Sequence, residues 1–344
     1  MRHAKRPGCG GVFRSSVVLA IVMLLGAPHV SAQDATPSRA RGARTPTGRS
    51  HIEFRSSAML SLHMLVRAGA AGAEVPESVR PAVEAVRAAD DRVWGMFDGI
   101  FASESSPEEI RLVLETYALR LQGEVGEALV AYAEALVSVE PAFRAEIWPL
   151  QEAAINEAKT GLEASRDAQG STCMSRICEW LGIADPRVVI PVYLVTVAPA
   201  PGGFTARSEL YKALCIVSVD VHRGSTLVEA TLHEAIHALD EHTRQQEPLT
   251  VLQALRKGLA DAGVAATDAR MRDVAHTLIF AAAAEVTREV VDPTHVAYGE
   301  TGGYYAKVPR ATEAVLPAWG RYAAGEIDAS ETVAEIVKIA TRPE

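Results

Sequence analysis

Cysteines, aromatic residues and long apolar runs are all scarce in this 344-residue sequence. Four cysteines with no Cys-x-x-Cys spacing argue against a structural zinc site made of thiolates. No run approaches the roughly 20 apolar residues that a membrane-spanning helix needs, so we expect no membrane span. Basic residues number 34 against 43 acidic ones, and a chain with a net charge of −9 is a poor partner for nucleic acid or anionic lipid. The sequence is 48% hydrophobic and 22% charged, which is an ordinary composition for a globular protein.

The first 32 residues follow the pattern of a secretory signal peptide. Four basic residues and no acidic one accompany an 11-residue apolar run from Val17 to Ala27, and the small residues Val30-Ser31-Ala32 follow. We expect cleavage near Ala32 and a secreted or periplasmic mature chain, with 30 basic and 43 acidic residues and thus a net charge of −13. An oxidising compartment permits a disulfide between two of the three remaining cysteines. These are Cys173, Cys178 and Cys215.

Residues 33–50 are rich in Arg, Thr, Pro and Gly, and we expect them to form a flexible linker. Residues 51–170 have apolar side chains at helical spacings of three and four, which predicts an N-terminal region of four or five helices. One of these helices is expected to begin at Ser106, because Pro107 lies in its first turn and acidic residues follow.

Residues 171–344 differ in character and form the second predicted domain. Residues 188–197 are rich in β-branched side chains and predict a strand, and residues 213–221 predict another. The stretch between them contains Pro-Gly-Gly and predicts a loop. Helical patterns resume at Thr226, where a capping box with Glu229 predicts a helix start. The expected fold is therefore α+β, mostly helical, with a small sheet.

A His-Glu-x-x-His motif lies in the predicted helix from Thr226 to Asp240. Residues four apart share one face of a helix, so His233 and His237 can reach the same metal ion. Glu234 stands beside the first of them, where its carboxylate can accept a proton from metal-bound water. The uncharged residues around the motif are typical of a buried metal helix rather than a solvated one.

The segment from Cys215 to Asp240 resembles the zincin metallopeptidases, because β-branched strands precede a helix that carries the motif among uncharged residues. The resemblance implies Zn²⁺ as cofactor and a small sheet whose antiparallel edge strand holds the substrate backbone. It also implies that a zinc-activated water hydrolyses a peptide bond. The metzincin subgroup continues with Gly and His three and six residues after the second ligand, where this sequence has Asp240 and Thr243. The gluzincin subgroup, in which a later Glu completes the site, is the closer pattern.

The third ligand is expected on a later helix, predicted from about Asp273 to Val291. Four alanines precede Glu285 in that helix, and small side chains would let it approach the metal helix closely. We therefore predict that Glu285 completes the metal site. The gluzincin resemblance implies that Glu289, one turn further on, orients a ligand imidazole. The competing ligands are Glu289, Asp240 and His242.

The C-terminal part also resembles a group of uncharacterised bacterial proteins with the same motif. Residues 276–280, 297–300 and 319–326 carry this resemblance, which implies family membership without implying a substrate. His276 lies nine residues before Glu285 and hence half a turn round a regular helix from it. His276 and Glu285 cannot share the metal face, so His276 is expected to be structural.

Hydrolysis at such a site also needs a donor for the developing oxyanion, often a Tyr or a His. Of the candidates after the ligand helix, we take Tyr305 as the donor. The full set is His295, Tyr298, Tyr304 and Tyr305. The sequence thus predicts an exported zinc-dependent hydrolase, a metallopeptidase that acts on peptide or protein substrates. The alternative is a zinc-binding pseudoenzyme or a helical scaffold protein of the envelope without catalysis.

Overall fold

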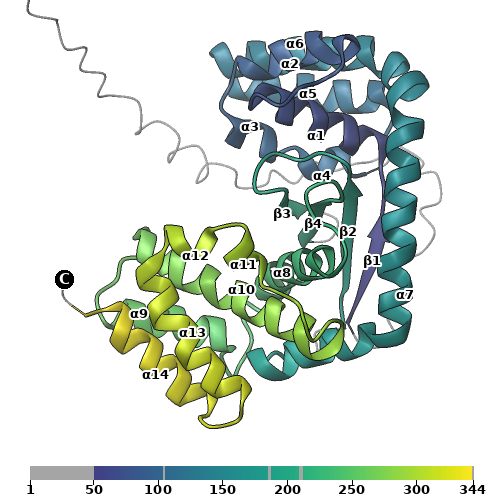
Figure 1. Ribbon diagram of the computed structural model, residues 1–344. Helices are drawn as coiled ribbons and strands as arrows, with labels where there is room; N and C mark the ends of the chain where they lie inside the picture. The colour runs from purple at the N-terminus through teal and green to yellow at the C-terminus, as the bar shows by residue number, and fades with distance from the viewer. Residues whose placement is uncertain (1–49, 104, 185–186, 209–211, 343–344) are drawn as a thin grey trace, which may run out of the picture. The chain divides into compact units, whose positions relative to one another are not determined.

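The computed structural model describes residues 50–103, 105–184, 187–208 and 212–342 (Figure 1). The predicted signal peptide and all but the last residue of the predicted linker lie outside these residues. The described chain is mostly helical and contains one small mixed sheet, which confirms the predicted α+β class.

The sheet has the strand order β1-β2-β4-β3 (Figure 1). The strands are β1 (His51–Arg55), β2 (Val189–Val195), β3 (Gly203–Ser208) and β4 (Lys212–Ser218). β1, β2 and β4 run parallel, whereas β3 is antiparallel to β4 and lies at the edge. β2 and β4 confirm the two predicted strands. The sequence pattern does not reveal β1, which is only five residues long, or β3, which begins directly at the Pro-Gly-Gly turn.

The N-terminal helices pack around a shared hydrophobic cluster. Within the described residues they are α1 (Ala58–Ala70), α2 (Arg80–Arg87), α3 (Asp91–Gly95), α4 (Asp98–Phe101), α5 (Pro107–Leu121) and α6 (Gly123–Ala142). α5 begins as predicted, because the Ser106 side chain accepts a hydrogen bond from the main chain of Glu109. Aromatic side chains such as Trp94 and Phe101 are fully buried in this cluster, which follows from their large apolar surface.

A long helix, α7 (Trp148–Leu181), leads from these helices to the second half of the chain. The predicted boundary at residue 170 falls inside α7, and β1 joins the sheet beside β2 although it precedes every helix. Successive side chains of a strand point to opposite faces. Tyr193 of β2 therefore packs with the N-terminal helices, whereas Val192 and Leu194 pack with α7 and the C-terminal helices. The two predicted regions share one sheet.

Helix α8 (Ser225–His242), which carries the predicted motif, packs against β3 and β4 of the sheet (Figure 1). α10 (Ala269–Val290) packs against α8, and its run of four alanines, 281–284, is buried. The remaining helices of the described chain are α9 (Val251–Asp261), α11 (Tyr298–Thr301), α12 (Tyr304–Lys307), α13 (Pro309–Ala323) and α14 (Ala329–Ala340). Among the described residues, no helix is long and apolar enough to span a membrane.

The disulfide that an oxidising compartment would permit is not formed among the described residues. Cys173 and Cys178 of α7 and Cys215 of β4 carry thiols. Cys215 is fully buried, and burial raises the pKa of its thiol well above the ordinary value. This thiol is therefore protonated and unreactive, and it acts as a small core side chain.

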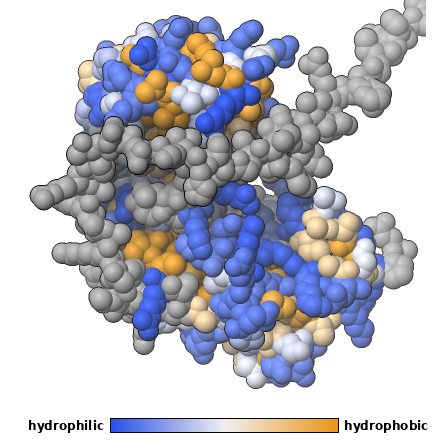
Figure 2. Space-filling view, turned by 180° about the vertical axis from the view of Figure 1, so that it is seen from behind, coloured by the Kyte–Doolittle hydropathy of each residue, from blue (hydrophilic) through white to orange (hydrophobic). Residues whose placement is uncertain are grey.

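Some apolar side chains remain on the surface, and Figure 2 shows several of them gathered over the N-terminal helices. The exposed large residues there include Leu112 and Leu119 of α5 and Val130 of α6. Leu119 and Val130 line a shallow groove between these two helices. Isolated surface leucines are common in soluble proteins, so this feature alone indicates no partner.

Candidate metal centre

Helix α8 presents His233 and His237 on one face, as the motif predicts. It spans Ser225–His242, which extends the predicted helix by one residue at its start and two at its end. The predicted capping box is wrong: Gly224 occupies the cap position and no side chain caps the helix. The reason is that the Glu229 carboxylate turns inward and binds the loop after α10.

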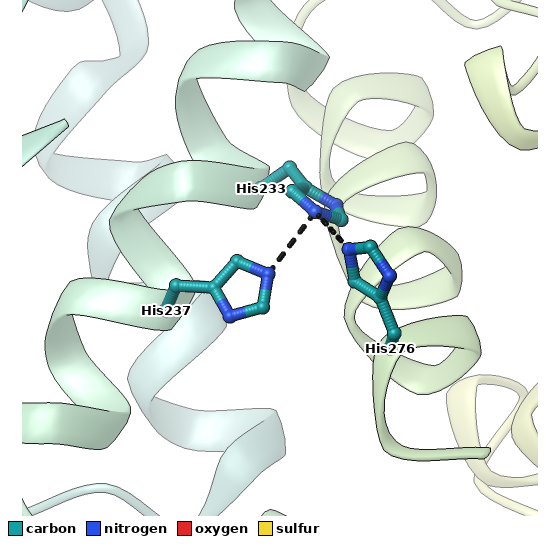
Figure 3. A group of neighbouring side chains, drawn as sticks. All are labelled: His233, His237 and His276. Carbon is teal, nitrogen blue, oxygen red and sulfur yellow. Dashed lines mark hydrogen bonds between the residues drawn. The ribbon is translucent and has the colours of Figure 1, made fainter. Parts of the chain in front are cut away.

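The third residue of the cluster is His276, from α10 (Figure 3). Its Nε2 atom lies 2.9 Å from Nε2 of His233, and Nε2 of His237 lies 3.2 Å from the same atom of His233. One ligand nitrogen from each of the three lies within 4.8 Å of the others. Two nitrogens on one tetrahedral zinc at the usual bond length are about 3.4 Å apart. The spacing is therefore that of side chains able to hold a single metal ion.

Hydrogen bonding alone satisfies this cluster poorly. A ring nitrogen of histidine has one hydrogen or one lone pair in the ring plane, so Nε2 of His233 cannot form two well-directed hydrogen bonds. Burial lowers the pKa of His233 well below its ordinary value, that of His237 to about 3 and that of His276 to about 4. The three imidazoles are therefore neutral near pH 7, the protonation state in which their lone pairs can bind a metal ion.

The structure does not bring Glu285 to the two motif histidines, contrary to the prediction. The Glu285 carboxylate forms an ion pair with Arg288, three residues further along α10. Glu289, predicted to orient a ligand imidazole, instead binds Arg176 of α7 at 3.0 Å. Two other candidates also lie outside the group of converging ligand atoms, namely Asp240 and His242.

The physical reason for this difference is the rotation of α10 about its axis. His276 and Glu285 lie on opposite sides of the helix, as predicted, but the side that faces α8 carries His276. Phe280, one turn after His276, lies on the same side, and its ring centre is 4.1 Å from that of His233. The sequence does contain a signal for this orientation. His276 and Phe280 are four residues apart and share one side of the helix, whereas Glu285 lies on the other side.

The Glu234 carboxylate lies beside the histidine cluster. Its Oε1 atom lies 3.9 Å from Nε2 of His233, and its Oε2 atom accepts a 2.8 Å hydrogen bond from the Thr205 hydroxyl of β3. β3 approaches closely, because a Cβ on Gly203 would lie 3.5 Å from Oε1 of Glu234. Burial raises the pKa of Glu234 to about 8. The edge strand therefore fixes the direction of this carboxylate.

The predicted oxyanion donors differ in their position relative to the site. Tyr298 lines the cleft that opens over the cluster of His233, His237 and His276. Tyr305, the predicted donor, packs under α11, where a Cβ on Gly299 would lie 2.5 Å from its ring. Tyr304 packs with its ring centre 5.2 Å from that of His276, and its hydroxyl points to a main-chain oxygen. Among the predicted donors, Tyr298 is thus the one that lines the cleft.

His222 is a cleft residue that no sequence motif reveals. It lies between β4 and α8, is 2% exposed and lines the cleft together with Tyr298. The two rings meet edge to face, with centres 4.7 Å apart. Nδ1 of His222 is buried and has no hydrogen-bond partner among the described residues, whereas the ring bonds the Pro201 carbonyl through its other side. His222 therefore contributes ring surface to the cleft, while its unpartnered nitrogen is enclosed by protein.

A buried Glu–His pair fixes the segment that carries Tyr298. Glu229, one turn before His233 on α8, accepts hydrogen bonds from Nε2 of His295 at 2.5 Å and from the main-chain N–H of Tyr298 at 2.8 Å. The other ring nitrogen of His295 lies 3.0 Å from the Ser225 hydroxyl. His295 thus connects α11 to the metal helix and does not line the cleft.

A cleft of about 940 Å³ opens over the three imidazoles. Residues 203–207 of β3 form one wall, α10 forms another, and α8 runs along the floor. His233 is buried, whereas His237 and His276 are partly exposed. A molecule in the cleft can therefore reach both the histidine cluster and Glu234.

Comparison with protein-family models, with curated proteins and with solved structures finds no match to this chain. The likeness to zincins therefore remains a likeness of one motif and its surroundings. The interpretation of the site depends on its own geometry.

Proposed function

We propose that this chain is a zinc-dependent hydrolase in which His233, His237 and His276 hold the ion. The observation that carries the proposal is the convergence of three imidazoles from two helices. Three protein ligands with a fourth position for water are typical of catalytic zinc sites, whereas structural sites have four protein ligands. Imidazole is a ligand that suits zinc, and the neighbouring carboxylate of Glu234 adds the base that hydrolysis needs.

Zinc, when bound, lowers the pKa of a coordinated water and polarises a carbonyl. Glu234 accepts the proton of that water and delivers it to the leaving amine. Its carboxylate form is favoured there, because a nearby positive charge lowers the pKa of a carboxyl group. The Thr205 hydroxyl keeps the carboxylate directed towards the metal. Tyr298, which lines the cleft, would donate a hydrogen bond to the oxygen on which negative charge develops.

The edge strand β3 favours a peptide as the substrate. It lines the cleft, and one of its two edges has no strand partner among the described residues. An extended peptide can add to such an edge through main-chain hydrogen bonds. That placement would bring one peptide bond past the metal cluster and Glu234. An antiparallel edge strand at this position is also what the zincin resemblance implies.

Zinc content and peptide cleavage, measured on the same preparations, test this proposal. We expect about one zinc per chain in the wild type, as a single three-ligand site requires. We expect loss of zinc in His276→Ala and retention in the matched control His51→Ala, which changes an exposed histidine of β1. Cleavage of a quenched peptide library by the wild type would support the hydrolase. Zinc binding without any cleavage would instead support the pseudoenzyme, and a chain that binds no zinc would contradict both.

A further inference from the structure

Basic side chains slightly outnumber acidic ones among the residues that line the cleft, although the chain as a whole is acidic. Five basic side chains line it: Arg207, Arg244, Arg256, Lys257 and Arg272. Apart from the two buried carboxyl groups beside the metal cluster, the acidic residues that line it are Asp240 and Glu241. The complete sequence has 34 basic and 43 acidic residues, so this local excess has the opposite sign to the net charge.

Arg207 differs from the other four cations. Each of those forms an ion pair with a carboxylate. The pairs are Arg244–Glu241, Arg256–Asp240, Lys257–Asp261 and Arg272–Asp273. Arg207 is exposed, and within the part of the chain that the structure describes its guanidinium has no ion pair or hydrogen bond. A guanidinium offers five N–H donors in a planar fork that fits a carboxylate, so Arg207 is available for a ligand.

Arg207 lies on the strand that contacts Glu234 beside the histidine cluster. It follows Thr205 by two residues on β3, and residues two apart point to the same face of a strand, about 7 Å from each other. The Thr205 hydroxyl binds Glu234, so the Arg207 side chain starts from the face that looks onto α8. A peptide lying along β3 with its scissile bond at Glu234 would place a residue near that bond beside Arg207.

We propose that the site selects peptides with an acidic side chain near the scissile bond, and that Arg207 is the residue that determines this specificity. The inference depends on the proposed function, because it names the substrate class of the same cleft. An acidic side chain would pair with the Arg207 guanidinium. A basic side chain would be repelled by it. Long-range attraction to an acidic protein favours basic peptides, so a preference for acidic ones has to come from the cleft.

Peptide binding without turnover tests the inference. Zinc-loaded Glu234→Gln is titrated into fluorescein-labelled decapeptides that are identical except for Asp, Ser or Lys at the central positions, and anisotropy is measured. We expect the Asp peptide to bind about tenfold more tightly than the Lys peptide at low salt. The difference should shrink at about 0.5 M salt, because exposed charges are then screened. Adding Arg207→Glu should invert the preference. Arg120→Glu, which reverses an exposed charge on α5 away from the cleft, should leave it unchanged.

The cleavage assay separates failure of the inference from failure of the proposed function. A preference for the Asp peptide in binding, together with no cleavage of any peptide, supports the inference and contradicts the hydrolase. Cleavage of the Asp and Lys peptides with equal kcat/KM supports the hydrolase and contradicts the inference. Absence of binding to the Asp peptide, or a preference that survives Arg207→Glu, overturns the inference as well. Arg207→Gln serves as the second variant, because it removes the charge and conserves the size, and circular dichroism checks the fold of both.

Discussion

At the scale of single residues, the role of Glu234 can be separated from metal binding. Its carboxylate lies beside the ligand His233 but is not among the converging ligand atoms. We expect Glu234→Gln to retain zinc and to lower kcat by about 10²–10⁴, the usual contribution of a general base. Glu289→Gln, which changes a surface carboxylate of α10, is the control and should keep full activity. Metal analysis and steady-state kinetics on both variants check this, and loss of zinc in Glu234→Gln would identify it as a ligand instead.

A second prediction at this scale concerns the third ligand. His276→Ala should weaken zinc binding as much as His237→Ala does, because each removes one of three ligands. The loss should exceed the roughly 10–100-fold that follows from losing a group that only orients a ligand. Glu285→Ala should bind zinc like the wild type, since its carboxylate is engaged with Arg288. Competition against a chromophoric chelator gives the affinities. A Glu285→Ala variant as weak as His276→Ala would restore the gluzincin assignment.

At the scale of secondary structure elements, local sequence patterns predict α8, α10, β2 and β4, because each has a long apolar period or a β-branched run. The edge strand β3 escapes such a prediction, because its six residues gain their order from pairing with β4 rather than from their own propensity. The third residue of the histidine cluster, His276, escapes prediction for a related reason. The period of α10 shows that His276 and Glu285 oppose each other, but which side faces α8 is decided by tertiary packing.

The link between α11 and α8 gives a prediction at the same scale. His295 and Glu229 are almost fully buried and bind each other, so His295→Ala leaves a buried carboxyl group without its partner. We expect a loss of about 3–5 kcal/mol in the free energy of unfolding. Ser225→Ala removes the outer hydrogen bond to His295 and one to Asp292, and it should cost less, about 1 kcal/mol. Urea unfolding of the three proteins measures the difference. Equal stability of the two variants would show that the pair does not hold the Tyr298 segment.

At the scale of the whole described chain, the sheet connects two hydrophobic clusters with different tasks. The C-terminal helices supply the three histidines and Glu234, whereas the N-terminal helices support the other face of the sheet. They also reach the edge strand, because the Arg67 guanidinium lies 5.4 Å from the ring centre of Phe204. Since β3 orients Glu234 through Thr205, the N-terminal helices contribute to the site without lining the cleft.

The metal-free protein should therefore have a stability that depends on pH in both directions, with a maximum near pH 6.5. Burial holds the pKa values of His233, His237 and His276 below the ordinary 6.5. Below pH 6.5 the unfolded chain binds protons at these histidines that the folded chain does not. Their contribution to the free energy of unfolding is therefore fully present above pH 6.5 and is lost as the pH falls towards the pKa values of the folded state. Glu234 acts with the opposite sign. Its pKa is about 8 against an ordinary 4.5, so its contribution is full below 4.5 and is lost as the pH rises through 8.

Thermal unfolding of the metal-free protein between about pH 4.5 and 9 measures both branches of this dependence. In Glu234→Gln the loss on the alkaline side should diminish, and the fall on the acid side should become steeper, because Glu234 opposes the histidines between pH 4.5 and 8. Zinc should raise the Tm by mass action, since it binds the folded chain. Its stabilising effect should fall on the acid side, because protons compete for the same imidazole lone pairs. A Tm of the metal-free protein that is flat from about pH 7 to 5 would contradict the burial of three neutral imidazoles, and with it the basis of the metal site.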